Sequence, residues 1–206
     1  ELRLVGSEMC IRDRYIGALL EELDGNKNLF LSYEIKSFKR KSSNYKKNRE
    51  NFDINLAYEI LNTYFNRVIE ISEYQIKLAQ KDSFDLSADE GIDIFYDDNE
   101  YASTMLELKE RWRKTTKNDF IISVLAKDDE GEIISNLTNR YERRIKRVLQ
   151  RKDEDIFLLA INIMTRQFDP HSTYLSPYNA EDFEIDMSLK LGGIGALLSN
   201  SATEDY

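Results

Sequence analysis

Apolar residues recur every three or four positions through most of this chain, which is the spacing of helices that bury one face. Short polar breaks such as Asp24-Gly25-Asn26 interrupt the pattern, as turns do. The spacing predicts helices over residues 15–23, from Ser32 into the following basic run, after Asp53, and over 100–125, 133–150 and 156–168. We therefore expect a mainly α fold, a domain of antiparallel helices joined by short turns.

The segment after Asp53 shows the clearest helical pattern, over roughly 27 residues at a repeat near 3.6. Its expected buried face comprises Leu56, Ile60, Leu61, Tyr64, Phe65, Val68, Ile71, Ile76 and Leu78. The helix over 100–125 is expected to bury Met105, Leu108, Trp112, Phe120, Ile121 and Val124. Ser32 and Asp153 are residue types that cap helix starts, and Pro170 ends the last helix because proline has no amide hydrogen.

The pattern changes after Phe183. The segment from Gly192 to Leu198 has too much glycine for a helix and is typical of a loop entering a strand. It lacks the lysine and hydroxyl residue of a phosphate-binding loop. Closely spaced glycines before a strand can instead point successive amides at a carboxylate, as in sites that capture peptide C-termini.

Composition indicates a soluble, helix-rich protein. The 206 residues are 41% hydrophobic and 33% charged, with a formal net charge of −9. That charge disfavours a general nucleic-acid binder, whose affinity depends on clustered cations. Two basic runs do occur, one over residues 36–49 and one made of Arg140, Arg143, Arg144, Lys146, Arg147 and Arg151. Such runs are usually solvated helix faces, although they could dock an acidic partner.

Candidate chemistry is sparse. His171 lies beside Ser172 and near Asp169, but residues this close in a turn rarely converge as a nucleophile and its base must. We expect these short polar side chains to satisfy backbone groups after the helix. The sequence has no HExxH spacing, and Cys10 is its single cysteine. We therefore predict no catalytic residue, no metal ligand and no cofactor within these residues.

The first fourteen residues differ in character from the rest. Met9-Cys10-Ile11-Arg12-Asp13-Arg14 is what a transposase adapter used in library preparation encodes. Residues 1–14 are therefore expected to be a non-native tail and are left out of the fold prediction.

Separated segments then form a recognisable series: Asp24-Gly25-Asn26-Lys27 with Phe30-Leu31, Leu137-Thr138-Asn139-Arg140-Tyr141, Asp153-Glu154-Asp155-Ile156-Phe157, the stretch from Phe168 to Pro177, Met187-Ser188-Leu189 and Gly193-Ile194-Gly195-Ala196. In this order they resemble the tail-specific, or carboxy-terminal processing, serine peptidases, in the long periplasmic form with a helical N-terminal domain. The similarity extends over essentially everything after residue 14.

The resemblance implies a helical N-terminal domain over 15–185 and the start of a truncated PDZ domain, with its first strand, over 186–206. Such enzymes bind apolar C-terminal tails of protein substrates in the PDZ domain and cleave with a Ser-Lys dyad. The dyad would lie beyond this chain, so the fragment is expected to be inactive alone. The implied peptide-binding residues are Leu191, Gly193, Ile194, Gly195 and Ala196.

The resemblance also implies a helical-repeat adaptor lipoprotein as a docking partner, and neither nucleic acid nor a small-molecule cofactor. A non-catalytic helical interaction module, an adaptor whose basic faces bind an acidic partner, is the alternative. A cytoplasmic nucleic-acid binder would need a basic balance that this chain lacks.

Overall fold

The computed structural model describes residues 14–45, 54–81, 84–86, 90–91, 100–126 and 130–188. Within them a first helix covers 14–24, followed by α2 (Ser32–Tyr45), α3 (Ile54–Gln80), α4 (Met105–Leu125), α5 (Glu130–Leu149), α6 (Asp153–Thr165) and α7 (Pro177–Ser188). The prediction of a mainly α fold is confirmed. The described residues contain no strand, only an isolated bridge between Leu31 and Ala102.

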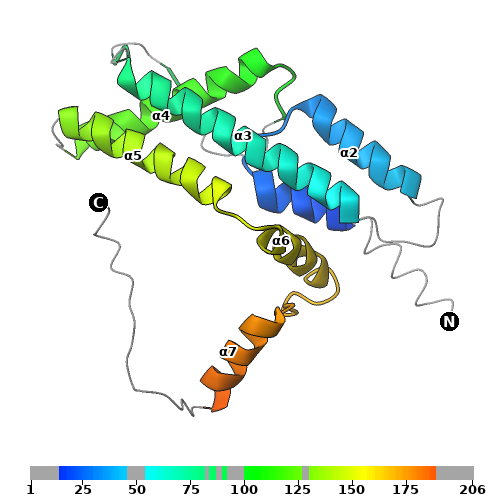
Figure 1. Cartoon of the computed structure of the whole chain (residues 1–206). Helices are drawn as coiled ribbons and strands as arrows, with labels where there is room; N and C mark the ends of the chain where they lie inside the picture. The colour runs from blue at the N-terminus through cyan, green and yellow to red at the C-terminus, as the bar shows by residue number, and fades with distance from the viewer. Residues whose placement is uncertain are drawn as a thin grey trace.

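The long helix α3 is the centre of the bundle. It packs against α2, α4, α5 and α6, and Figure 1 shows α3 and α5 side by side with the chain running in opposite directions. Its length of 27 residues agrees with the sequence pattern. Because its apolar side chains wrap around much of the helix, several partners are needed to cover them.

Three apolar clusters follow one another along α3. The first joins the first helix, α2, α3 and α6, with Leu19, Phe30, Ile60, Leu61 and Ile163 among its most buried members. The second, near the middle, consists of Leu31, Ile71, Ala102, Leu108 and Trp112. The third, at the end of α3, consists of Ala79, Phe120, Ile133, Leu137 and Tyr141. The first cluster therefore holds the first helix, α2 and α6 on α3, the second holds α4, and the third holds α4 and α5.

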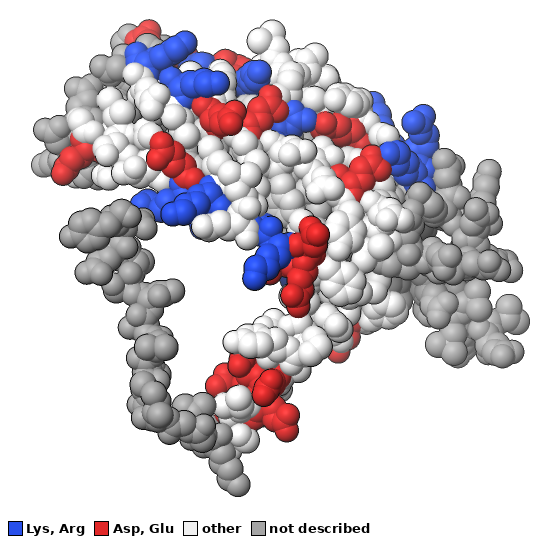
Figure 2. All heavy atoms as spheres, viewed as in Figure 1, with Lys and Arg blue, Asp and Glu red and all other residues white. Residues whose placement is uncertain are grey.

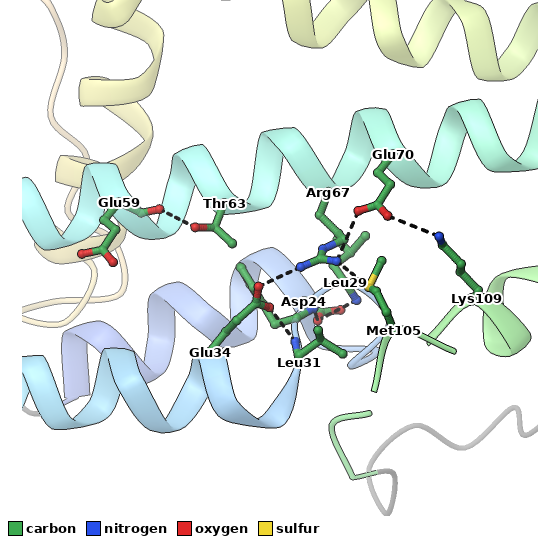
Figure 3. A network of polar contacts seen from close by, with 11 residues as sticks. Asp24, Leu29, Leu31, Glu34, Glu59, Thr63, Arg67, Glu70, Met105 and Lys109 are labelled. Carbon is green, nitrogen blue, oxygen red and sulfur yellow. Dashed lines mark hydrogen bonds and ion pairs between the residues drawn. The ribbon is translucent and has the colours of Figure 1, made fainter. Parts of the chain in front are cut away.

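A buried ion pair lies between the first two clusters (Figure 3). Arg67 of α3 donates through one terminal nitrogen to Glu34 Oε1 of α2 at 2.7 Å, and through the other to Glu70 and to the sulfur of Met105. The second oxygen of Glu34 accepts the amide of Leu31 at 2.7 Å. Arg67 thereby links α2, α3 and the start of α4 where few apolar contacts are available.

The helix starts differ from the sequence prediction in detail. The helix expected from residue 100 begins at Met105, because Ser32 donates its amide to the carbonyl of Ala102 and Thr104 caps α4 through the amide of Glu107. Ser32 is the first helical residue and not a cap. Asp153 is likewise the first residue of α6, whose cap position is Lys152.

The burial of α4 was predicted only in part. Leu108, Trp112 and Phe120 are buried as expected, and Met105 and Ile121 are half-buried. The prediction was wrong for Val124, which is 40% exposed. Near the end of α4 the partners α3 and α5 cover one narrow side of the helix, so this residue of the predicted stripe faces outward.

The helix α7 was not predicted. Pro177 occupies its first position, where a missing amide hydrogen costs nothing, and the buried Ser176 accepts the amides of Asn179 and Ala180 through its hydroxyl and carbonyl. Residues 186–188 are helical, and the strand expected after them lies outside the described residues. Within the described part of the chain, α7 has no buried residue and packs against no other helix (Figure 1).

A search of the described residues finds no helix with the length and apolar character required to span a bilayer.

We predict that Arg67→Met lowers the free energy of unfolding by about 2 to 4 kcal/mol, because it leaves Glu34, whose side chain is 13% exposed, without its counter-charge. Adding Glu34→Gln should recover a large part of the loss, since the amide oxygen can still accept from Leu31. Urea denaturation followed by circular dichroism measures both. Lys41→Met, which breaks the exposed ion pair with Glu59, is the control and should cost below about 1 kcal/mol. A loss for Arg67→Met no larger than that of the control would contradict this assignment.

Candidate functional site

The residues predicted to bind peptides lie outside the described part of the structure. Leu191, Gly193, Ile194, Gly195 and Ala196 all follow Ser188, where the description ends. They remain a prediction. The structure does show what the other family-like segments do.

The segment from Asp24 to Leu31 is a loop closed around one carboxylate. Asp24 is 3% exposed, and its two oxygens accept the amides of Asn28, Leu29 and Phe30 at 2.7, 2.9 and 2.8 Å. Lys27 within the loop has a positive φ of 53°. Burial raises the pKa of Asp24, although the three amides and the charge of Arg111 act in the opposite direction. Asp24, together with Phe30 and Leu31, therefore defines the turn between the first helix and α2.

The segment from Leu137 to Tyr141 joins α5 to α4. Tyr141 is fully buried and donates its hydroxyl to Asp119 of α4 at 3.0 Å, while Arg140 pairs with the same carboxylate. Burial raises the pKa of Tyr141 to about 12, and the charge of Asp119 adds to this effect. Leu137 belongs to the third apolar cluster. This segment holds two helices together.

The segments around α6 are also structural. Asp155 accepts the amide of Lys152 at 2.9 Å and so caps the start of α6. After α6, Asp169 accepts the amide of His171 at 3.1 Å, as expected of short polar side chains in this turn. The His171 side chain is exposed and forms no hydrogen bond or ion pair with any described residue. Asp169, His171 and Ser172 are therefore not arranged as a catalytic triad.

Lys117 is the one lysine among the described residues that is buried, at 5% exposed. Its nitrogen lies 3.6 Å from Glu90 and has no hydrogen-bond partner among the residues that the structure describes. A lysine base needs a serine hydroxyl within hydrogen-bond reach. Lys117 pairs with a carboxylate instead, and no group of three or more His, Cys, Asp or Glu in the described ranges could hold a metal.

A pocket of about 350 Å³ lies between α3 and α5. We call it the arginine pocket, because Arg144, Arg147 and Arg151 line it above an apolar floor that includes Leu29, Val68 and Ile71. In Figure 2, Lys and Arg side chains lie on α5 and at its junction with α6, where acidic side chains lie beside them. This pocket is the candidate binding site that the described residues form.

The three arginines are held by neutral groups. Arg144 donates to the amide oxygen of Gln75 at 3.1 Å and lies over the Tyr141 ring, 5.4 Å from its centroid. Arg147 donates to the carbonyl of Arg143, and Arg151 lies 4.6 Å from the centroid of the Phe65 ring. Burial lowers the pKa of Arg144, and the positive charges of Arg140 and Arg147 act in the same direction, whereas Tyr141 and the charge of Asp119 oppose the shift.

Sequence reasoning found the basic run and interpreted it as a solvated face that could dock an acidic partner, and every member of the run except Arg144 is exposed. Part of the signal for a pocket was present in the spacing, because positions 144 and 147 are three residues apart on α5, whereas Arg151 follows the end of that helix at Leu149. The same run supplies Arg140 to a different neighbour, Asp119. The orientation of α5 relative to α3 decides which arginines have a carboxylate neighbour. The sequence of α5 alone does not specify that orientation.

The fold and the contacts of these segments define a helical domain in which the family-like segments form a turn, a helix cap and contacts between helices. The family model of the tail-specific protease N-terminal domain matches residues 11–178. The chain therefore belongs to the tail-specific protease N-terminal domain family.

A curated relative supports the same assignment. The chain is similar to the tail-specific protease of Haemophilus influenzae, with 33% identity over 196 residues. The aligned region covers 94% of this chain but 27% of that protein. The chain thus corresponds to about a quarter of the length of this relative.

Asp24→Asn should lower the free energy of unfolding by about 2 to 4 kcal/mol, because an amide presents its own N–H groups to backbone amides that need acceptors. Thermal and urea unfolding measure the loss. Glu21→Gln, an exposed position on the same helix, removes the same charge and should stay within about 0.5 kcal/mol of the parent. Equal effects of the two substitutions would show that net charge, and not the loop, is responsible.

Tyr141 should make the fold sensitive to alkaline pH. Its pKa is raised from 10.0 to about 12, so its contribution to stability is complete below pH 10 and is lost as pH rises toward 12. By pH 11 the loss should reach about 1 to 2 kcal/mol. Denaturation at pH 9 and 11 should show a smaller decline for Tyr141→Phe than for the parent. Tyr178→Phe, at a residue 72% exposed, should decline as the parent does; an unchanged decline in Tyr141→Phe would refute the prediction.

Proposed function

We propose that this chain is the N-terminal part of a serine endopeptidase that recognises apolar C-terminal tails of protein substrates through a PDZ domain. A Ser-Lys dyad in the part of the protein that follows these residues cleaves the substrate. The support is the family match over 11–178 together with 33% identity to a tail-specific protease. The chain aligns with 27% of that relative. In the proposal, the serine and the lysine lie in the remaining part of such an enzyme.

The proposed chemistry needs a lysine that accepts a proton near neutral pH. Burial in an apolar pocket lowers a lysine pKa by disfavouring the charged form. The neutral amine then takes the proton of the serine hydroxyl, and backbone amides stabilise the oxyanion of the tetrahedral intermediate. Lys117 does not serve this role in the proposal, because Glu90 keeps a negative charge beside it.

Substrate recognition is assigned to the segment after α7. Leu191, Gly193, Ile194, Gly195 and Ala196 would enter the peptide-binding groove, with glycine amides directed at the terminal carboxylate and a strand edge paired with the tail. The helix α7 carries the chain from the bundle to this segment (Figure 1). The bundle itself acts as a scaffold in the periplasm and as a docking surface for a helical-repeat adaptor lipoprotein.

A non-catalytic interaction module is the second candidate. The arginine pocket favours a binding role for the helical domain, whether or not a catalytic domain is attached. The two candidates make different predictions for proteolysis.

We predict that the 206-residue chain alone does not cleave an unfolded protein ending in apolar residues, whereas the full-length protein does. Cleavage should fall when the last residues of the substrate are aspartates, and it should stop with an active-site serine reagent. Gel electrophoresis and mass spectrometry of the products measure all three effects. Cleavage by the chain alone, or none by the full-length protein, would overturn the proposal.

The groove is tested in the same full-length protein. Gly195→Val should raise KM for the apolar-tailed substrate by about tenfold or more, because the side chain obstructs the approach of the peptide backbone. Gly17→Ala is the control, since a Cβ at Gly17 would meet no atom within 4 Å.

A further inference from the structure

The lining of the arginine pocket contains three cations and no carboxylate. Five other arginines pair with carboxylates within 4 Å: Arg67, Arg111, Arg113, Arg140 and Arg166. No ion pair joins Arg144, Arg147 or Arg151 to any carboxylate that the structure describes. Arg40 and Arg143 likewise have no ion pair among the described residues, but Arg144, Arg147 and Arg151 are the ones that converge on one pocket. An anionic ligand would supply the missing charge.

One of the three arginines, Arg144, is preorganised by buried neighbours, while Arg147 and Arg151 are exposed. Gln75, which holds Arg144, is 2% exposed, and its amide nitrogen donates to Thr116 Oγ1 at 3.2 Å. Thr116 is fully buried and donates in turn to the carbonyl of Trp112 at 2.8 Å. This chain of hydrogen bonds fixes one side of the Arg144 guanidinium, and its remaining N–H groups stay available to a ligand. Less side-chain freedom is then lost on binding.

The floor of the pocket restricts the kind of anion. Val68, Ile71 and Val148 present apolar surface beneath the guanidinium groups. An inorganic anion would leave this surface in contact with water, whereas a ligand with an apolar side chain beside its charge would cover it. The volume of about 350 Å³ lies within the usual range for ligand pockets.

The overall charge restricts the ligand further. A nucleic acid carries a long series of phosphates and would be repelled by a protein with a net charge of −9. A short acidic peptide segment experiences mainly the local field of the three arginines. Its carboxylates match guanidinium groups in planar geometry, and the neighbouring apolar side chains match the floor.

We propose that the arginine pocket is a docking site for an acidic segment of a partner protein, in which Asp or Glu carboxylates stand beside an apolar side chain. The carboxylates pair with Arg144, Arg147 and Arg151, and the apolar side chain packs on Val68 and Ile71. The site belongs to the helical domain alone, so it does not depend on the proposed peptidase activity.

Fluorescence anisotropy with the 206-residue chain tests this proposal. The probe is a short labelled peptide that carries glutamates beside leucines, compared with the same peptide containing glutamine in place of glutamate. Arg147→Gln combined with Arg151→Gln should weaken binding of the glutamate peptide by about tenfold or more. The control is Lys36→Gln with Arg40→Gln, which removes the same charge from the exposed surface of α2 and should leave binding unchanged.

Two measurements keep the result interpretable. Thermal unfolding shows whether the variants stay folded, and arginine side-chain NMR of the parent chain should show the peptide shifting the Nε resonances of Arg144, Arg147 and Arg151. Absence of binding, equal binding of the glutamine peptide, or equal loss in the α2 control would overturn the proposal. Displacement of the peptide by millimolar phosphate alone, or preferred binding of single-stranded DNA at the same arginines, would overturn it in favour of another ligand.

Discussion

The structure depends on the burial of α3. A helix with apolar side chains around much of its surface cannot stay in water, and α2, α4, α5 and α6 each cover part of it. The three apolar clusters are arranged along α3 because each neighbour meets a different stretch of it. Where the apolar cover is interrupted, Arg67 and Glu34 bring α2 and α3 together through opposite charges, a pairing that is specific for those two positions.

The sequence segments that resemble tail-specific peptidases have structural tasks in this domain. Asp24 closes a loop on three backbone amides, Tyr141 and Arg140 meet Asp119 of another helix, and Asp155 caps α6. Asp24 and Tyr141 are buried polar groups that would be costly without their partners, whereas Asp155 caps α6 at the surface. A family can therefore be recognised here from residues that stabilise the domain and take no part in chemistry.

The second basic run shows how one charged segment can serve two purposes. Arg140 faces α4 and is neutralised by Asp119, so it contributes to the fold. Arg144, a helical turn further, faces α3 and is held by the neutral Gln75. The two arginines differ in their partners. A carboxylate partner neutralises the charge of Arg140 within the fold. The amide partner of Arg144 orients the guanidinium and leaves its charge available to a ligand.

The sequence by itself determined the helices, since a helical repeat and its polar breaks are local properties; even the unpredicted α7 carried a local signal in Ser176 and Pro177. It also showed a run of closely spaced arginines in and just after the α5 segment. Only the tertiary structure decided that α4 begins after the bridge at Ala102, that Val124 faces outward and that the arginine pocket lacks a carboxylate. These outcomes depend on which helices, far apart in the sequence, pack against one another. The spacing of residues along one helix does not specify the side chains of the neighbouring helix.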